Sequence, residues 1–257
     1  MKVPYTLVAV AVDKKLGFRG NISAVVSLSE PLEEQTLQRI ANDLNQPATT
    51  FLWEEKEKMR VRWFAPDAEI GLCGHGSLAA FSVLNQEQEL SSSIDTIKGK
   101  PLSDNRVEIE LSAIPVEKKL EVPSVLTEGL GVEVLEYYET KNKNIVVVKN
   151  ENVLRKMKPN FQKLRESETF GYTVTTKGDE VDFVSRTLVP HVQQLEDHAT
   201  GSSHAVLAPF WSKRLNKELL NSWQLSPRGG AFELSIPGDK LRLTCTNSIL
   251  GKGEIEV

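Results

Sequence analysis

The chain has 257 residues, of which 40% are hydrophobic and 26% charged, and its formal net charge is -4. This composition is typical of a globular protein and argues against a nucleic-acid partner. No apolar run is long enough for a membrane span, and the run from Val3 to Val12 is typical of a strand because no small-residue cleavage site follows it. Two cysteines, Cys73 and Cys245, are too few for a disulfide framework. We therefore expect a cytoplasmic protein with a small-molecule partner or none.

The pattern of the chain predicts few helices and many strands. A helix is expected between Ser29 and Asn45, where Pro31 suits a first turn and apolar residues recur with helical spacing. Further helices are expected to begin near Gly76 and Gly201. Strands are expected over residues 5–12, 59–64, 106–111, 144–148, 181–184, 231–236 and 241–246, the last two joined by a turn at 237–240.

A weak internal repeat divides the chain into two similar parts. Three residue pairs share nearly one spacing: Asn21 and Asn144 are 123 residues apart, Pro66 and Pro190 are 124, and Gly76 and Gly201 are 125. The repeat predicts two similarly folded halves, residues 1–115 and 116–257, with the boundary between about 113 and 134 and with the last strands able to pair back onto the first half. Chance similarity of short apolar segments is the alternative.

Each predicted half contains a glycine loop that leads into a helix. Backbone N–H groups at a helix start attract anions, so the loops at Gly76 and Gly201 predict a binding site for one small acid. The alternative is that these glycines only permit tight turns and close packing.

Five segments together carry a resemblance to a known family. They read "FRGNISAVV", "RWFAPDAEIGLCGHGSLAA", "VDFVSR", "EDHATGSSHAVLAPFW" and "QLSPRGG", and they extend in this order from Phe18 to Gly230. In this combination the chain resembles the PhzF family of phenazine-biosynthesis-like isomerases. The resemblance implies an α+β, diaminopimelate-epimerase-like fold of two pseudo-symmetric halves, each a curved, mostly antiparallel β-sheet or barrel around a central helix. It also implies an active site between the halves. A homodimer is an open expectation.

The activity implied by the resemblance is a cofactor-independent isomerisation, in which a proton moves on a small carboxylate-bearing metabolite. Asp197 stands at the position of the family's aspartate. The family's glutamate is replaced by Ala48, which cannot accept a proton. Either another group takes over, or the chain is a catalytically impaired member that binds a small anion or a protein partner.

The candidate catalytic residues are Asp197, His75 and, third, Cys73. An imidazole has a suitable ordinary pKa of about 6.5, and a helix start favours a thiolate. His75 is equally suited to anchoring its loop, and a buried cysteine is usually inert. The matched segments imply these substrate-binding residues: Asn21, Gly74, Gly76, Ser77, Thr200, Gly201, Ser202 and Gly229.

Three other titratable residues lie in the same loops. Glu69 is expected to bond local amides, His198 to face solvent, and His204 to pack or to support Asp197. The four histidines show no metal-ligand spacing, so no metal site is predicted, and adjacency of Ser202, Ser203 and His204 is not triad geometry.

Overall fold

The computed structural model describes residues 2–256, which form two compact units. Unit 1 comprises Met1–Leu111 and Arg242–Val257, and unit 2 comprises Ser112–Leu241. The last strand, β18 (Ser248–Glu256), returns to pair antiparallel with β1 (Lys2–Val10). The end of the chain therefore belongs to the unit that contains its beginning.

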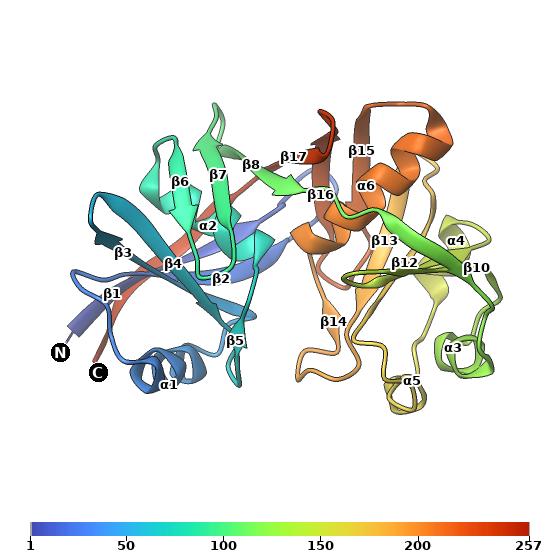
Figure 1. Cartoon of the computed structure of the whole chain (residues 1–257), viewed down its shortest axis with the longest axis horizontal. Coiled ribbons are helices and arrows are strands. Elements are labelled where there is room, and N and C mark those ends of the chain that lie inside the picture. The colour runs from blue at the N-terminus through green and yellow to red at the C-terminus, as the bar shows by residue number, and fades with distance from the viewer. Residues whose placement is uncertain (1, 257) are drawn as a thin grey trace. The chain divides into compact units, whose positions relative to one another are not determined.

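Unit 1 is mostly antiparallel, with two helices (Figure 1). Its remaining elements are β2 (Asn21–Ser27), α1 (Glu34–Leu44), β3 (Ala48–Glu55), β4 (Lys58–Phe64), β5 (Glu69–Ile70), α2 (Gly74–Leu84), β6 (Gln88–Ser91), β7 (Thr96–Pro101), β8 (Arg106–Ser112) and β17 (Lys240–Thr246). Both β8 and β17 extend slightly across the unit boundary, and they pair with each other.

Unit 2 has the same character with additional short helices. Its elements are β9 (Val116–Leu120), α3 (Ser124–Leu130), β10 (Val134–Thr140), β11 (Asn144–Val148), α4 (Glu151–Lys156), α5 (Phe161–Leu164), β12 (Tyr172–Lys177), β13 (Phe183–Leu188), β14 (Glu196–Asp197), α6 (Gly201–Leu215), β15 (Leu219–Gln224) and β16 (Gly230–Ser235).

The two units repeat one order of strand pairing. In unit 1, β1–β2 is antiparallel, β2–β3 parallel, β3–β4 and β4–β5 antiparallel, and β4–β6 parallel. In unit 2, β10–β11, β11–β12, β12–β13, β13–β14 and β13–β15 follow with the same directions in the same order. The predicted pseudo-symmetry of the halves is therefore confirmed in the topology of each unit.

Each unit contains a largely buried helix that begins at its glycine loop, α2 at Gly74 and α6 at Gly201. In α2 the eight residues from Gly74 to Phe81 are all buried, which is the pattern of a helix surrounded by its own domain. In α6, Pro209 has no N–H to donate to the carbonyl of Ala205, and the N–H of Ile114 donates to that carbonyl instead at 2.9 Å. The proline is thereby accommodated inside a central helix.

The helix expected between Ser29 and Asn45 is α1, which begins later, at Glu34. It ends where Asn45 adopts φ 48°, the left-handed conformation common after a helix. The first strand ends at Val10 rather than Val12 because Ala11 has φ 61°, outside the range of a strand. Among the described residues, the longest helix has 15 residues, and none is both long and apolar enough to cross a membrane.

Candidate functional site

In unit 1, the loop before α2 brings Cys73 and His75 together. Cys73 is the N-cap of α2, and its Sγ accepts the N–H of Gly76 at 3.3 Å and lies 3.4 Å from His75 Nδ1. Both side chains are buried, at 4% and 7% exposure. The loop thus places a backbone N–H and an imidazole nitrogen in contact with one sulfur, a geometry in which a proton can pass between the two side chains.

Close packing around Gly76 requires a glycine at that position of the loop. A Cβ on Gly76 would lie 2.6 Å from Trp63 Cδ1 and 2.7 Å from Thr50 Oγ1. Ser77 donates its hydroxyl to the carbonyl of Cys73 at 2.7 Å, which fixes the first turn of α2. Gly74, the first residue of the helix, is also buried.

Two other residues named from the sequence lie at strand starts in unit 1. Asn21 begins β2, is fully buried, and accepts the N–H of Ile22 through its Oδ1. Ala48 begins β3 and is also fully buried, with its carbonyl accepting the hydroxyl of Ser23 at 3.0 Å. The position at which the family resemblance calls for a glutamate is thus shielded from water.

In unit 2, Asp197 is held by a directed chain of hydrogen bonds. Thr200 donates its hydroxyl to Asp197 Oδ2 at 2.7 Å, and that same hydroxyl oxygen accepts from Gln224 Nε2 at 3.0 Å. Gln224 Nε2 also donates to the Asp197 carbonyl, and Gln224 Oε1 accepts the N–H of Thr200. The carboxylate therefore has a fixed orientation directly before the first turn of α6.

Gln224 is a candidate functional residue that was not predicted from the sequence. It is fully buried at the end of β15 and is the first residue of the quoted segment "QLSPRGG". Within that segment, Ser226 donates to the carbonyl of His198 and accepts the N–H of Gly229, which has φ 69°. The segment thus fastens the loop that carries Asp197.

His204 is buried and uncharged. Its Nδ1 lies 2.8 Å from the carbonyl of Thr200, its ring centroid lies 4.1 Å from that of Phe232, and burial lowers its pKa to about 4, partly offset by the hydrogen bond to Thr200. The carbonyl can only accept, so Nδ1 carries the ring proton. His204 thus packs in the core and contacts the helix start at Thr200; its hydrogen bond is not to Asp197.

The first residues of α2 and α6 correct the alignment of the two halves that the repeat spacing predicted. Because α2 begins at Gly74 and α6 at Gly201, the counterpart of the N-cap Cys73 is Thr200, and Gly76 is not the counterpart of Gly201. The short strands before the helices support this alignment. Glu69 pairs with Phe64 in unit 1 and Glu196 pairs with Leu188 in unit 2, and these two glutamates precede Cys73 and Thr200 by the same number of residues.

The glutamates of these short strands form matched ion pairs. Arg62 makes two hydrogen bonds of 2.7 Å to Glu69, and Arg186 makes hydrogen bonds of 2.8 and 2.7 Å to Glu196. Glu69 was expected to bond local amides, but it binds the guanidinium of Arg62 instead. The hydrogen bonds that Arg62 donates to Glu69 and Glu34 raise its pKa further above its ordinary range.

Ser202, in the first turn of α6, contacts a lysine that was not predicted. The Nζ of Lys143 lies 2.9 Å from Ser202 Oγ, and the lysine is only 5% exposed. The two residues are 59 positions apart, so no local pattern links them.

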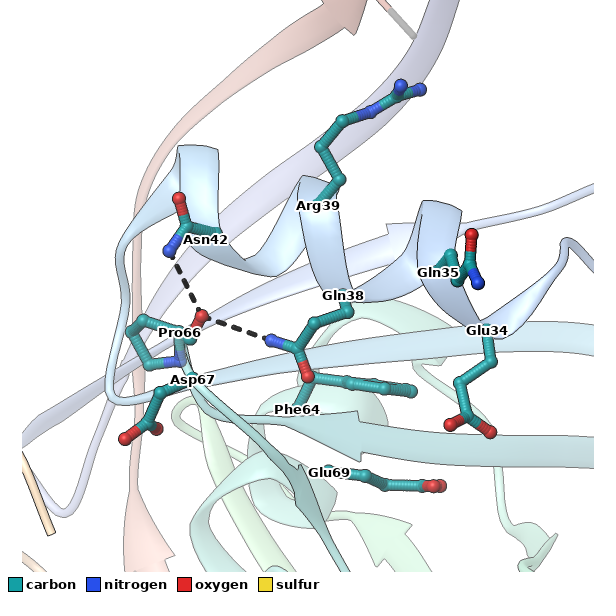
Figure 2. Close-up of a pocket in the computed structure, with 9 residues that line it drawn as sticks. All are labelled: Glu34, Gln35, Gln38, Arg39, Asn42, Phe64, Pro66, Asp67 and Glu69. Atoms are coloured by element: carbon teal, nitrogen blue, oxygen red, sulfur yellow. Dashed lines mark hydrogen bonds between the residues drawn. The ribbon is translucent and has the colours of Figure 1, made fainter.

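A pocket of about 600 Å³ lies elsewhere in unit 1, along α1 (Figure 2). Gln38 and Asn42 donate to the carbonyl of Pro66 at 3.0 and 3.1 Å, and Arg62 neutralises Glu34 at its edge. Of the residues considered as candidates from the sequence, only Glu69 lines this pocket. Across residues 2–256, no group of three or more His, Cys, Asp or Glu side chains is arranged to hold a metal ion.

Comparison with known proteins places this geometry in a family. The model of the PhzC-PhzF family, described as phenazine biosynthesis-like protein, matches residues 14–244. An uncharacterized isomerase of Halalkalibacterium halodurans is 33% identical over 88% of this chain and 89% of its own. A human phenazine biosynthesis-like domain-containing protein is 30% identical over 86% of this chain and 88% of its own.

Solved structures agree. A PhzF family protein from Enterococcus faecalis has a TM-score of 0.92 and 31% identity over 100% of both chains. A hydroxyproline epimerase from Agrobacterium vitis, at 10% identity, shares the fold with a TM-score of 0.70 over 99% of this chain and 92% of its own. The expected epimerase-like α+β fold is confirmed, and the chain belongs to the PhzC-PhzF family of phenazine biosynthesis-like proteins.

Proposed function

We propose that the protein is a PhzF-like isomerase that moves a proton on a small carboxylate-bearing metabolite, with Asp197 as one of its proton-carrying groups. The observation that carries this proposal is the fixed geometry of Asp197, whose Oδ2 accepts from Thr200 at 2.7 Å while its backbone carbonyl accepts from Gln224 at 2.6 Å. A positioned carboxylate beside a helix start is suited to proton transfer with an anionic substrate. Membership of a family that contains relatives named as isomerases supports the same reaction class.

The second proton carrier is proposed to be His75, with Cys73 as the alternative. Ala48 has no titratable group, so the missing glutamate must be replaced by another acid or base if the reaction proceeds. His75 Nδ1 and Cys73 Sγ lie 3.4 Å apart, so a proton can pass between them. Because they share this contact, either residue can exchange with the substrate while the other supplies or receives the proton.

The substrate's carboxylate is proposed to bind the backbone N–H groups of the glycine-containing loops. The proposed N–H donors are Gly74 in unit 1 and Gly201 and Ser202 in unit 2. The N–H groups of Gly76, Ser77 and Thr200 already donate to Cys73 Sγ, to the Cys73 carbonyl and to Gln224 Oε1, so these residues are proposed to shape the loops, as are Asn21 and Gly229. The reaction itself needs no cofactor, because the groups named above exchange the proton directly.

Exchange of solvent deuterium into a panel of small enoic and amino acids tests which unit 1 residue carries the proton. We expect His75→Asn to slow exchange at least about 100-fold, the usual contribution of one acid–base group, and Cys73→Ala to slow it less. Loss of exchange in Cys73→Ala with full activity in His75→Asn would reverse the assignment. Equal rates in both variants and the wild type would remove this pair from the mechanism.

Restoring a carboxylate at residue 48 gives a complementary test. Ala48 is fully buried, so a glutamate there is desolvated, which raises its pKa toward neutrality at a cost in stability. We expect Ala48→Glu to accelerate exchange and Ala48→Gln, of the same size, not to. A rate unchanged by Ala48→Glu would show that this position no longer faces a reacting substrate.

A binding protein without catalysis is the second candidate function. The buried alanine at residue 48 favours it, because this side chain cannot accept or donate a proton. Binding of small carboxylates without any exchange in wild type or in Ala48→Glu is the outcome that supports it. A cytoplasmic homodimer is a further expectation, and light scattering checks its oligomeric state.

A further inference from the structure

His204 has a second ring nitrogen, Nε2, in the interior of unit 2. Because Nδ1 of the neutral ring donates to the carbonyl of Thr200 at 2.8 Å, Nε2 is an acceptor. Nε2 is buried, and no group of the described residues donates to it. The rings of Phe183 and Phe232, whose centroids lie 6.0 and 4.1 Å from that of the imidazole, have no N–H or O–H to offer. A buried acceptor of this kind is costly unless a donor reaches it.

Two serine hydroxyls lie on the strands beneath this imidazole. Ser222 of β15 pairs with Phe183 on one side and with Phe232 on the other, so it lies between the two rings that the imidazole contacts. Ser185 of β13 is its diagonal neighbour. Both serines are fully buried, and neither hydroxyl has a hydrogen-bond partner in the part of the chain that the structure describes.

The two serines point toward α6. Gln224 is two residues after Ser222, hence on the same face of β15, and its side chain contacts the N-cap residue of α6. Thr187 is two residues after Ser185 on β13, and its hydroxyl donates to Ser203 of α6 at 2.9 Å. The two serine hydroxyls and the histidine nitrogen therefore face the same layer between helix and sheet.

In unit 1 both the imidazole and the two serines are replaced. The counterpart of His204 is Ser77, which also donates to the carbonyl of its N-cap residue, at 2.7 Å, but whose side chain ends at that hydroxyl. With β4 aligned on β13 and β6 on β15, the counterparts of the two serines are Val61 and Leu90, both buried and apolar. The hydroxyls on the sheet thus accompany the imidazole on the helix, which indicates that they serve its second nitrogen.

We propose that unit 2 binds one water molecule between α6 and strands β13 and β15, where it donates to His204 Nε2 and hydrogen-bonds the hydroxyls of Ser185 and Ser222. Buried waters with about three polar partners are common in proteins. This water holds the imidazole whose Nδ1 fixes the Thr200 carbonyl, and the Thr200 hydroxyl in turn donates to Asp197 Oδ2. His204 and Ser222 are therefore positioning residues for that carboxylate, a role that rests on the proposed function.

The sign of a stability change tests the water site. Without a partner, the Ser222 hydroxyl would be an unsatisfied buried group, and Ser222→Ala would raise the urea midpoint. With the proposed water, Ser222→Ala deprives His204 Nε2 of its donor, so we expect the midpoint to fall. In a His204→Asn background, which keeps a donor for the Thr200 carbonyl but has no atom at the place of Nε2, the same change should leave the midpoint unchanged or raise it.

Thr173→Val is the matched control for this comparison. It removes another fully buried hydroxyl that lacks a partner within the described chain, on β12 opposite Thr187, four residues along β13 from Phe183. Its effect on the midpoint should be the same in the wild-type and His204→Asn backgrounds. A rise of the midpoint in Ser222→Ala, or an equal fall in both backgrounds, would overturn the water site.

A high-resolution crystal structure of the wild type gives the direct observation. It should show a water oxygen within about 3.2 Å of His204 Nε2 and of at least one of the two serine hydroxyls. Direct contact between Ser222 Oγ and Nε2, or electron density without a water between them, would overturn the proposal.

Two measurements test the positioning of Asp197. We expect Ser222→Ala to lower kcat of deuterium exchange about threefold or more with KM within about twofold, and Thr173→Val to leave both unchanged. The ¹³C NMR signal of the Asp197 carboxyl should move in Ser222→Ala in the same direction as in Thr200→Val, which removes the hydrogen bond to that carboxyl directly. An unmoved carboxyl signal would overturn the positioning role. Absence of exchange in the wild type would contradict the isomerase reaction, and the carboxyl signal would then decide the positioning role by itself.

Discussion

The guanidinium of Arg186 makes a two-pronged ion pair with the carboxylate of Glu196, and both side chains are largely buried, at 9% and 11% exposure. Arg186 also donates to the carbonyl of Met157 at 2.6 Å. Glu196 is followed directly by Asp197, and both lie in the short strand β14. The ion pair thus fixes the strand that presents the proposed catalytic carboxylate.

Removal of this guanidinium is expected to be costly. Arg186→Met leaves Glu196 as a buried charge without its partner, which should lower the free energy of unfolding by about 3 kcal/mol or more. The counterpart Arg62→Met is the control, because Arg62 and Glu69 are 24% and 38% exposed and such pairs contribute about 1 kcal/mol or less. Urea unfolding of the two variants measures the difference, and equal losses would contradict the assigned difference in burial.

His204 should make stability depend on pH. Its folded-state pKa of about 4 lies below the ordinary 6.5, so between these values the unfolded chain binds a proton that the folded chain does not. Its contribution is therefore complete above pH 6.5 and is lost as the pH falls toward 4, by about 3 kcal/mol in total. His204→Asn keeps a donor for the Thr200 carbonyl without titrating. Urea unfolding from pH 7 to 4 should show a shallower pH dependence for this variant, and identical slopes would refute the prediction.

Gly76→Ala should disturb the unit 1 loop. The new methyl group would press on Trp63, Thr50 and Cys73 at 2.6, 2.7 and 3.1 Å, and such overpacking costs about 1–3 kcal/mol. Gly251→Ala is the control, since nothing lies within 4 Å of a Cβ at that position. Thermal unfolding compares them, and a Gly76→Ala protein as stable as Gly251→Ala would show that the loop relaxes freely.

Thr200 should act on the reaction through Asp197. Thr200→Val removes the hydroxyl that donates to Asp197 Oδ2, whereas Thr200→Ser keeps a hydroxyl at the same position. We expect the valine variant to lower kcat of deuterium exchange about tenfold or more with little change in KM, because the hydrogen bond that orients the carboxylate is lost. The serine variant should retain the wild-type kcat, and equal kcat values for all three proteins would argue against this role.

The sequence predicted those features that depend on local pattern. Glycine loops leading into apolar segments marked the starts of α2 and α6, and the repeat spacing predicted two similar halves. Asn21 and Asn144 each proved to begin a strand. These signals are local because caps, turns and strand starts are set by neighbouring residues.

Contacts between distant segments left no such signal. Gln224 reaches Thr200 across 24 positions, and Lys143 reaches Ser202 across 59, so their roles depend on the register of paired strands. A lysine in a basic run is ordinarily exposed, and the burial of Lys143 arises from the turn between β10 and β11. Sequence spacing also misaligned the two loops by two residues, because the helix starts Gly74 and Gly201 are 127 positions apart rather than 125. Only these helix starts reveal Thr200 as the counterpart of Cys73.

The most direct test of the isomerase account is the rate of solvent-deuterium incorporation into small enoic and amino acids by wild type and by Asp197→Asn. The asparagine keeps the size and an acceptor for Thr200 but cannot carry a proton at neutral pH. The account predicts incorporation by wild type into at least one acid of the panel and a reduction of at least about 100-fold in Asp197→Asn. Equal rates for the two proteins, slow or fast, would contradict it.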